Sequence, residues 1–207
     1  MPSIERMICD KFAIDLRSGI PLCSRRGTRV TLAELFGEAH YNNGAEIGVQ
    51  AGIYSEVLCK ANPNLKLLCV DSWAPYRDFP RKSRQDAMFL ETMNRLANYP
   101  GATIKRMTSI EASRDVPNGS LDFVYIDAAH DFDSVMMDLI HWVPKVRRRG
   151  IVAGHDYCYM RFCSVIGAVN AYRESRGIGT WYVTDDPGVR DLSRQLGRMP
   201  SWFWVQP

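Results

Sequence analysis

The sequence predicts an α/β fold, in which a mostly parallel sheet is covered by helices on both faces, in one domain spanning residues 1–207. Short apolar segments alternate with segments whose apolar residues recur at helical spacing, as in sheets whose strands are joined by helices. The last two apolar segments, 181–184 and 202–205, leave no room for a long helix between them and should pair antiparallel. No repeat, low-complexity tract or long linker divides the chain.

Helices are predicted from caps, stops and apolar stripes. The first 30 residues are weakly patterned and are expected to form a helical cover. Thr31 and Glu34 have the spacing of a capping box, which predicts a helix from Thr31 to about His40. Asn62-Pro63 should end a helix over 53–61, because proline disfavours a helical residue before it. Three more helices are expected from apolar stripes, made by Phe89, Met93 and Leu96; by Val135, Met136, Leu139, Ile140 and Val143; and by Phe162, Val165, Ile166, Val169 and Tyr172.

Strands are expected at 45–49, 65–70, 103–107, 121–126, 151–153, 181–184 and 202–205. Ligands of such sheets bind at the carboxyl ends of the strands. The residues that follow or end the strands are therefore the candidate site, namely Gly48, Asp71, Asp127, His155 and Asp156.

The segment around Gly48 and Gly52 is the first candidate binding element. Two glycines in a strand-to-helix turn let the backbone approach a ligand, and the helix N-terminus offers free N–H groups. Asp71 ends the next strand, where a carboxylate can accept hydrogen bonds from both hydroxyls of a ribose. Together they indicate a cofactor that contains adenosine. The dinucleotide fingerprint G-x-G-x-x-G is absent, because the spacing is Gly48-x-x-x-Gly52.

The motifs resemble class I S-adenosylmethionine-dependent methyltransferases. Glu46-Ile-Gly48-Val-Gln50-Ala-Gly52 resembles their first motif, and Val124-Tyr-Ile-Asp127-Ala-Ala-His130 the I-D-G-x-H segment of an O-methyltransferase-like branch. Asp138-Leu-Ile-His-Trp142 and Gly150-Ile-Val-Ala-Gly-His155-Asp156-Tyr157 match its D-L-x-x-W and G-G-x-x-x-x-H-D-Y segments. The resemblance covers 45–172 and implies a Rossmann-like three-layer sandwich with a seven-stranded sheet and an antiparallel C-terminal strand.

The same resemblance assigns the cofactor site. It implies that Glu46, Gly48 and Gly52 shape the methionine side, that Asp71 binds the ribose, and that Thr108-Ser109 approaches the adenine. The cofactor-binding residues it implies are Glu46, Gly48, Gln50, Gly52, Tyr54, Ser55, Asp71, Ser72, Trp73, Thr108, Ser109, Asp127 and Ala128. Trp73 has an alternative interpretation as an aromatic anchor of the 72–86 segment.

The chain departs from the branch at two places. Arg149 replaces the first glycine of the G-G pair, which should alter only the turn before the fifth strand. Ala128 and Ala129 replace residues that are often glycine and polar, so Ala129 cannot supply the carboxylate some relatives place there.

Asp127, His155 and Asp156 end neighbouring strands and could bind a divalent metal, Mg²⁺ or Mn²⁺ rather than Zn²⁺, because carboxylates and imidazole suit such ions. The alternative is that His155 and Asp156 only cap the fifth strand. His130 and Asp127 are the candidate catalytic residues. An imidazole with an ordinary pKa of about 6.5 could remove the acceptor's hydroxyl proton at neutral pH.

The function predicted is methyl transfer to a hydroxyl of a small molecule or sugar. The loop 72–86, within a substrate-side region at 72–98, should help cover the acceptor, and its Arg77, Arg81, Lys82 and Arg84 would tolerate an anion. Rival interpretations are a nicotinamide-dependent oxidoreductase, a nucleic-acid methyltransferase and a non-catalytic cofactor-binding module. The oxidoreductase would need the missing glycine pattern, and base methyltransferases usually carry [DN]-P-P-[YFW] where this chain has Asp127-Ala-Ala-His130.

Composition limits the setting and the partners. The net charge of +3 is too small to indicate nucleic acid, and no apolar stretch approaches the roughly 18 residues of a membrane span. The start lacks the order of a secretory signal, and the six cysteines contain no C-x-x-C pair, so disulfides and zinc fingers are not expected. We expect a cytoplasmic enzyme with no membrane or nucleic-acid partner, and leave open whether it forms a homo-oligomer.

Overall fold

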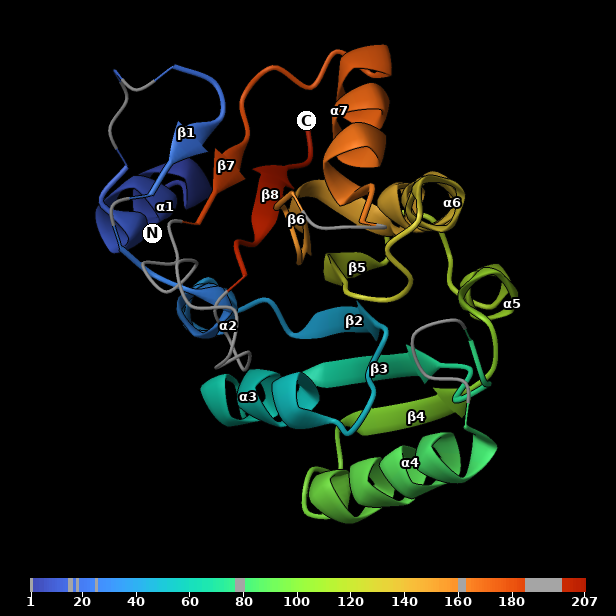
Figure 1. The fold of residues 1–207 in the computed structure, drawn as a ribbon. Helices are drawn as coiled ribbons and strands as arrows, with labels where there is room; N and C mark the ends of the chain where they lie inside the picture. The colour runs from blue at the N-terminus through green and yellow to red at the C-terminus, as the bar shows by residue number, and fades with distance from the viewer. Residues whose placement is uncertain are drawn as a thin grey trace.

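The computed structural model describes residues 2–14, 17, 19–24, 26–76, 81–159, 163–184 and 199–207. Its centre is one sheet with the strand order β1-β7-β8-β6-β5-β2-β3-β4 (Figure 1). The strands are β1 (Leu22–Cys23), β2 (Asn43–Ile47), β3 (Lys66–Asp71), β4 (Ala102–Arg106), β5 (Leu121–Ile126), β6 (Val146–Gly154), β7 (Tyr182–Val183) and β8 (Trp202–Val205). β8 is antiparallel to β6 and to β7, and every other pair is parallel. The predicted α/β fold with an antiparallel C-terminal strand is confirmed.

Helices cover both faces of the sheet and make it the middle of three layers (Figure 1). One face carries α1 (Ile4–Phe12), α2 (Arg29–Glu38), α3 (Ile53–Ala61) and α4 (Lys82–Leu96), and the other carries α5 (Ser109–Arg114), α6 (Phe132–Trp142) and α7 (Val165–Ser175). A short 3-10 turn, Val143–Lys145, follows α6. Alternate residues of β5 supply the two cores: Phe123 and Tyr125 pack with α1 to α3, whereas Val124 and Ile126 pack with α6 and α7.

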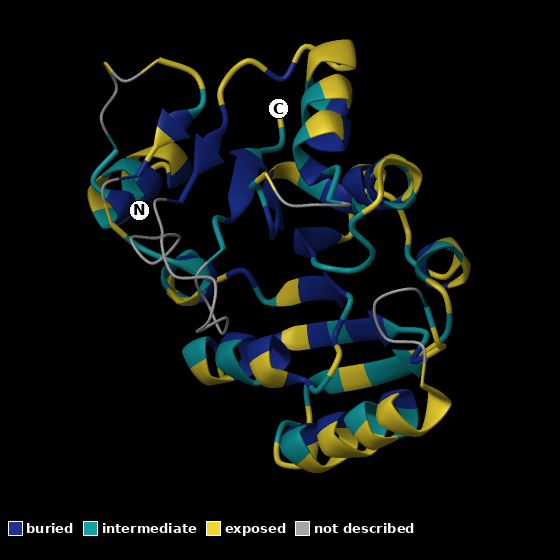
Figure 2. Ribbon diagram, in the orientation of Figure 1, coloured by how far each residue is buried: buried dark blue, intermediate teal, exposed yellow. Residues whose placement is uncertain are grey.

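The central strands are buried on both faces (Figure 2), as parallel sheets covered by helices require. All six residues of β5 are buried, which explains its continuous apolar sequence. The carboxyl ends of β2, β3 and β5 therefore point out of a rigid core. Among the described residues, no helix combines the length and the apolar character needed to cross a membrane.

Two expected helix boundaries differ from the structure, and the structure contains one helix that was not expected. The second helix begins at Arg29 because Thr28 is its N-cap, and Thr31 is the third residue of that capping box and not the cap. The helix predicted at 87–98 begins earlier, at Lys82, so Lys82 and Arg84 lie on α4 and not on a loop. The helix α5 was not predicted. Phe162, Arg77 and the segment between the last two strands lie outside the described residues.

The N-terminal region gives the sheet an eighth strand. Within the described part of the first 30 residues, α1 and the start of α2 are helical, but Leu22–Cys23 pairs in parallel with β7. The region expected to form a helical cover therefore also contributes a short strand. A two-residue edge strand leaves no periodic pattern that could reveal it.

Arg149 lies in β6 and not in a turn before it. The pairing of β5 with β6 shifts between Leu121 and Phe123, which is the mark of a β-bulge, and Arg149 adopts φ +62° there. The Tyr41 hydroxyl donates to the Arg149 carbonyl. Arg149 thus keeps the left-handed backbone that a glycine adopts without strain.

Candidate functional site

The turn after β2 is shaped by a glycine that no other residue can replace. Gly48 has φ +89°, and a Cβ placed there would lie 2.1 Å from the Asp127 carbonyl oxygen. The backbones of the β2 and β5 ends therefore touch at Gly48. Gly52 follows with φ +72° as the N-cap of α3, which has no side-chain cap. The first backbone N–H groups of α3 therefore have no side-chain cap.

The Asp71 carboxylate ties this turn to the end of β3. It accepts hydrogen bonds from the backbone N–H groups of Val49 and Gln50, both at 3.0 Å, and of Trp73 at 2.8 Å. A carboxylate has about four acceptor positions, so Asp71 keeps capacity for a further donor. It stands where a ribose was expected to bind, at the carboxyl end of its strand.

A cavity of about 440 Å³ opens at these strand ends. Of the predicted cofactor-binding residues, the following line it: Gly48, Gln50, Asp71, Ser72, Thr108, Ser109, Asp127 and Ala128. The wall also contains residues that the sequence reasoning missed, among them Tyr76, Gln85, Met88, Ile110, Met137 and Asp138. Thr108 and Ser109 lie in this wall at the start of α5, where the Thr108 side chain caps the helix by accepting a hydrogen bond from Glu111 N–H.

Five of the predicted cofactor residues do not line the cavity. Gly52 is the N-cap of α3. Glu46 and Ser55 are buried and share a hydrogen bond donated by Ser55. The Tyr54 hydroxyl donates to the Arg29 carbonyl at 2.9 Å. Trp73 is buried, and its indole N–H donates to the Gln50 carbonyl at 2.7 Å.

The placement of Trp73 fits the anchor interpretation. Its ring packs edge-on against Phe89 of α4, with ring centroids 4.9 Å apart, and its backbone adopts φ +43°. With Thr92, which donates to the same Gln50 carbonyl at 2.8 Å, it fixes the glycine turn from behind. Trp73 therefore positions the cavity wall and does not form its surface.

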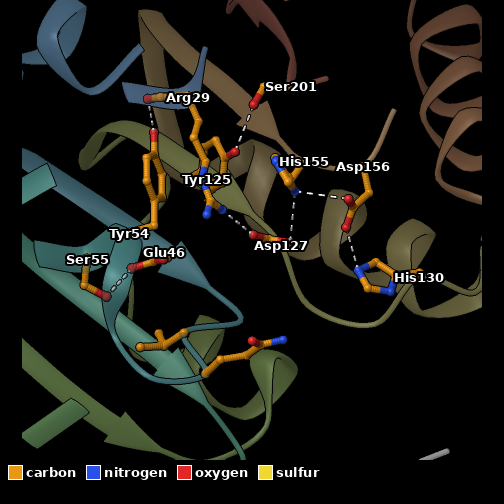
Figure 3. Close-up of polar contacts among 12 residues, drawn as sticks. Arg29, Glu46, Tyr54, Ser55, Tyr125, Asp127, His130, His155, Asp156 and Ser201 are labelled. Carbon is orange, nitrogen blue, oxygen red and sulfur yellow. Dashed lines mark hydrogen bonds and ion pairs between the residues drawn. The ribbon is translucent and has the colours of Figure 1, made fainter. Parts of the chain in front are cut away.

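Beside the cavity lies a cluster of acids and bases at the ends of β5 and β6 (Figure 3). His130 Nε2 lies 2.8 Å from Asp156 Oδ2. His155 Nδ1 lies 3.1 Å from Asp156 Oδ1 and 3.7 Å from Asp127 Oδ1. Arg29 Nη1 lies 3.4 Å from Asp127 Oδ2 and completes the cluster from α2. Asp127 is the one described residue that belongs both to this cluster and to the cavity wall.

The charges of the cluster follow from burial and pairing. The hydrogen bond to Asp156 raises the pKa of His130 to about 9, against the effect of burial. Burial opposes ionisation of Asp156, but the hydrogen bonds from His130 and His155 outweigh it and lower the pKa of this carboxyl. Burial raises the pKa of Asp127, and the nearby His155 counteracts that rise. This arrangement therefore favours the protonated form of His130 at neutral pH.

The donor set suits a divalent metal, with one change from the expected ligands. Asp127, His130 and Asp156 each offer a ligand atom, and these atoms lie within 4.8 Å of one another. His130 takes the place expected of His155, whose Nδ1 faces the two carboxylates and whose Nε2 is buried without a hydrogen-bond partner. Asp156 has φ +57°, a left-handed backbone that turns the chain between the side chains of His155 and Asp156. Two carboxylates and an imidazole are ligands that Mg²⁺, Mn²⁺ or Zn²⁺ accept.

Arg29 was missed because nothing in its sequence context marks it. It is the first residue of α2, and its guanidinium lies 5.1 Å from the centroid of the Tyr54 ring as well as beside Asp127. Burial lowers the pKa of Arg29, but neighbouring Tyr125, Asp127 and other groups raise it overall, so it stays charged. It is the cation that faces Asp127 from the opposite side to the histidines (Figure 3).

A protein-family model described as a methyltransferase domain matches residues 45–157, which is more than half of the chain. The chain belongs to this methyltransferase family. The match spans the glycine turn, Asp71, Asp127 and the His155-Asp156 pair, so it covers the site just described. The resemblance to class I S-adenosylmethionine-dependent methyltransferases is thereby confirmed, and the nicotinamide-dependent oxidoreductase is set aside.

Solved structures show that the methyltransferase has the expected fold. A candidate caffeoyl-CoA O-methyltransferase from Staphylococcus aureus is 14% identical with a TM-score of 0.59, covering 100% of this chain and 93% of that one. The O-methyltransferase TomG from Streptomyces achromogenes, in complex with S-adenosylmethionine, is 14% identical with a TM-score of 0.60, covering 86% and 79%.

A curated relative resembles only part of the methyltransferase. The uncharacterized protein y4gI from Sinorhizobium fredii is 35% identical over 111 residues, which is 48% of this chain and 12% of that protein. This chain therefore corresponds to a small part of the relative's length.

Proposed function

We propose that this methyltransferase transfers the methyl group of S-adenosylmethionine to a hydroxyl group of a small molecule or sugar. The observation that carries the proposal is that Asp127 is shared between the cavity and the cluster. A cofactor in the cavity and an acceptor beside the cluster would then meet at this residue. Both solved relatives named above are O-methyltransferases by description, which agrees with the proposal.

The cofactor would be bound by the residues that line the cavity. Asp71 would accept hydrogen bonds from the ribose hydroxyls, and the turn from Gly48 to Gln50 would face the methionine part. Four carboxylates line this cavity, and no lysine or arginine does so among the residues described. A wall of that charge favours a sulfonium cation.

Methyl transfer to a hydroxyl releases one proton, and the cluster would take it up. The oxygen attacks the methyl carbon as the carbon–sulfur bond breaks, giving an ether and S-adenosylhomocysteine. His130 would accept the hydroxyl proton in its neutral form, and Asp156 would hold its ring in place. Asp127 would orient the hydroxyl, since positioning supplies much of the rate in a direct displacement.

Asp127, His130 and Asp156 would hold a divalent metal in the same place, and His155 would orient the two carboxylates. When bound, such an ion would bind the acceptor oxygen and lower the pKa of its hydroxyl. His130 cannot be proton acceptor and metal ligand through the same Nε2 atom. The metal-assisted and the metal-free routes are therefore distinct, and chelation separates them.

The proposal is tested by incubating the purified protein with methyl-labelled S-adenosylmethionine and a panel of hydroxylated aromatics and sugars, with and without Mg²⁺ or Mn²⁺. We expect label in a base-stable methyl ether, located by NMR, and loss of that product in Asp127→Ala. Label found only on nitrogen acceptors or on RNA would contradict the proposal. Unchanged turnover after exhaustive chelation would remove the metal and leave the His130 route.

A further inference from the structure

One acidic side chain of the cavity is not explained by the cluster or by Asp71. Asp138 lies on α6, is only 5% exposed and lines the cavity. Its Oδ1 accepts a hydrogen bond from the Ser109 hydroxyl. Among the described residues no other group donates to this carboxylate, so its second oxygen is left for something in the cavity.

The Asp138 carboxylate is held in a fixed direction. Trp142, one turn further along α6, is fully buried and donates its indole N–H to Ser109 Oγ at 2.8 Å. Because Ser109 Oγ accepts this hydrogen bond, its own hydroxyl proton is donated to Asp138. This chain of hydrogen bonds from Trp142 through Ser109 fixes Oδ1 and leaves Oδ2 without a donor among the described residues.

The surroundings of Asp138 suit a flat ring that carries a donor. Ile110 and Met137, the immediate neighbours of Ser109 and Asp138 in the chain, also line the cavity and offer apolar contact. Burial raises the pKa of Asp138 to about 6. At pH 8 the group is therefore ionised and can only accept hydrogen bonds.

The other three acidic residues of the cavity wall are less suited to accept a hydrogen bond from a ring bound in the cavity. Asp71 already binds three backbone N–H groups, and Asp127 faces Arg29 and His155. Asp133 lies exposed in the first turn of α6. Asp138 is the buried acid of the wall with an oxygen that no described protein group uses.

We propose that Asp138 selects the base of the cofactor by accepting a hydrogen bond from the exocyclic 6-amino group of adenine. This rests on the proposed function, in which the cavity holds S-adenosylmethionine. A purine with a 6-oxo group, such as hypoxanthine, would set an oxygen against the carboxylate. The cavity therefore distinguishes amino from oxo purines through one side chain, because an unmatched buried polar group is costly.

The test is calorimetric titration at pH 8 of the wild type with S-adenosylhomocysteine and with S-inosylhomocysteine, which differ at position 6 of the purine. We expect the adenosyl compound to bind at least tenfold more tightly. Asp138→Asn keeps an oxygen for Ser109 but presents an N–H₂ donor to the cavity. We expect it to weaken the adenosyl compound at least tenfold and to strengthen the inosyl compound, reversing the preference.

Asp133→Asn is the matched control, because it removes one negative charge from the same wall. It should change both affinities by the same factor and leave their ratio unchanged. Equal binding of the two compounds by the wild type would overturn the assignment, and this needs no variant to fold. An unchanged ratio in a folded Asp138→Asn variant would overturn it as well. Failure of the wild type to bind either compound would instead contradict the proposed function.

Discussion

His130 and Asp156 form an ion pair across two loops, with Nε2 and Oδ2 2.8 Å apart, although they lie 26 positions apart in the chain. The loop after β5 supplies the imidazole and the loop after β6 supplies the carboxylate. The pairing converts a histidine that would be neutral in mildly basic solution into a cation. It therefore fixes the pH range in which the ring can act as a base.

The ion pair predicts that His130 titrates at a higher pH than an ordinary histidine. His130 in the wild type should titrate near pH 9, because Asp156 stabilises its charged form. In Asp156→Asn that stabilisation is lost, and the pKa should fall toward the ordinary value of about 6.5. NMR titration of the histidine ring protons in chelator measures both, with His130→Gln assigning the signal. Asp133→Asn, which leaves the pair intact, should titrate like the wild type, and an unmoved pKa in Asp156→Asn would refute the pairing.

The raised pKa of His130 should also appear in the pH dependence of turnover, once an acceptor is found. If His130 accepts the proton, the metal-free rate rises with pH up to about 9, since only the neutral ring is a base. Asp156→Asn should shift this rising limb to lower pH while lowering the maximum rate. A rate independent of pH between 6 and 9 would exclude His130 as the base.

Asp71→Ala should weaken binding of S-adenosylmethionine at least tenfold. Hydrogen bonds from ribose hydroxyls to a charged acceptor contribute roughly 1.5–3 kcal/mol each. The variant also frees the backbone N–H groups of Val49, Gln50 and Trp73, so it should melt at a lower temperature than the wild type. Asp71→Asn, which keeps one acceptor oxygen, separates the two effects. Calorimetry that finds equal affinity in wild type and Asp71→Ala would disprove the ribose assignment.

Gly48→Ala should destabilise the fold strongly, by roughly 2–4 kcal/mol, because it combines strain at φ +89° with a clash against the Asp127 carbonyl. Gly119→Ala is the matched control, with φ +69° and no atom within 4 Å of the new Cβ. The control should cost only about 1 kcal/mol. Urea unfolding measures both, and equal losses would show that the β2 and β5 ends do not touch as described.

Glu46→Gln should remove a pH-dependent loss of stability. Burial raises the pKa of Glu46 to about 8 from an ordinary 4.5, so the folded state binds this proton more tightly than the unfolded state does. Wild-type stability should therefore fall as the pH rises from about 4.5 to 8. Relative to the wild type, the variant should gain about 2–4 kcal/mol across that window. Glu34→Gln, at an exposed side chain, should show no such gain, and parallel curves for Glu46→Gln and wild type would contradict the burial argument.

Elements with strong local signals could be predicted from the sequence. The helix Ile53–Ala61 lies where Asn62-Pro63 ends it, and β5 occupies the apolar segment Leu121–Ile126. Thr28 and Thr31 can each be interpreted as the N-cap at the start of α2. The sequence does not show that Thr28 is the one that caps the helix. The short β1 depends on pairing with β7, which is distant in the chain.

The sequence predicted which candidate residues lie at the ends of strands, but not which way their side chains point. Spacing placed Asp71, Asp127 and Asp156 at strand ends, and the structure brings them to one edge of the sheet. His130, and not His155, completes the group of three potential metal ligands, and the spacing of the residues in the sequence does not reveal it. Asp138 matched a helix motif, but its role in the wall depends on Ser109, which lies 29 positions earlier.

A crystal structure of the protein grown with S-adenosylhomocysteine tests most directly whether the cavity binds the cofactor. We expect the ligand in the cavity at the ends of β2, β3 and β5, with its ribose hydroxyls hydrogen-bonded to Asp71 and its sulfur on the side of Asp127. A ligand bound elsewhere, or a cavity that stays empty at saturating ligand, would contradict it.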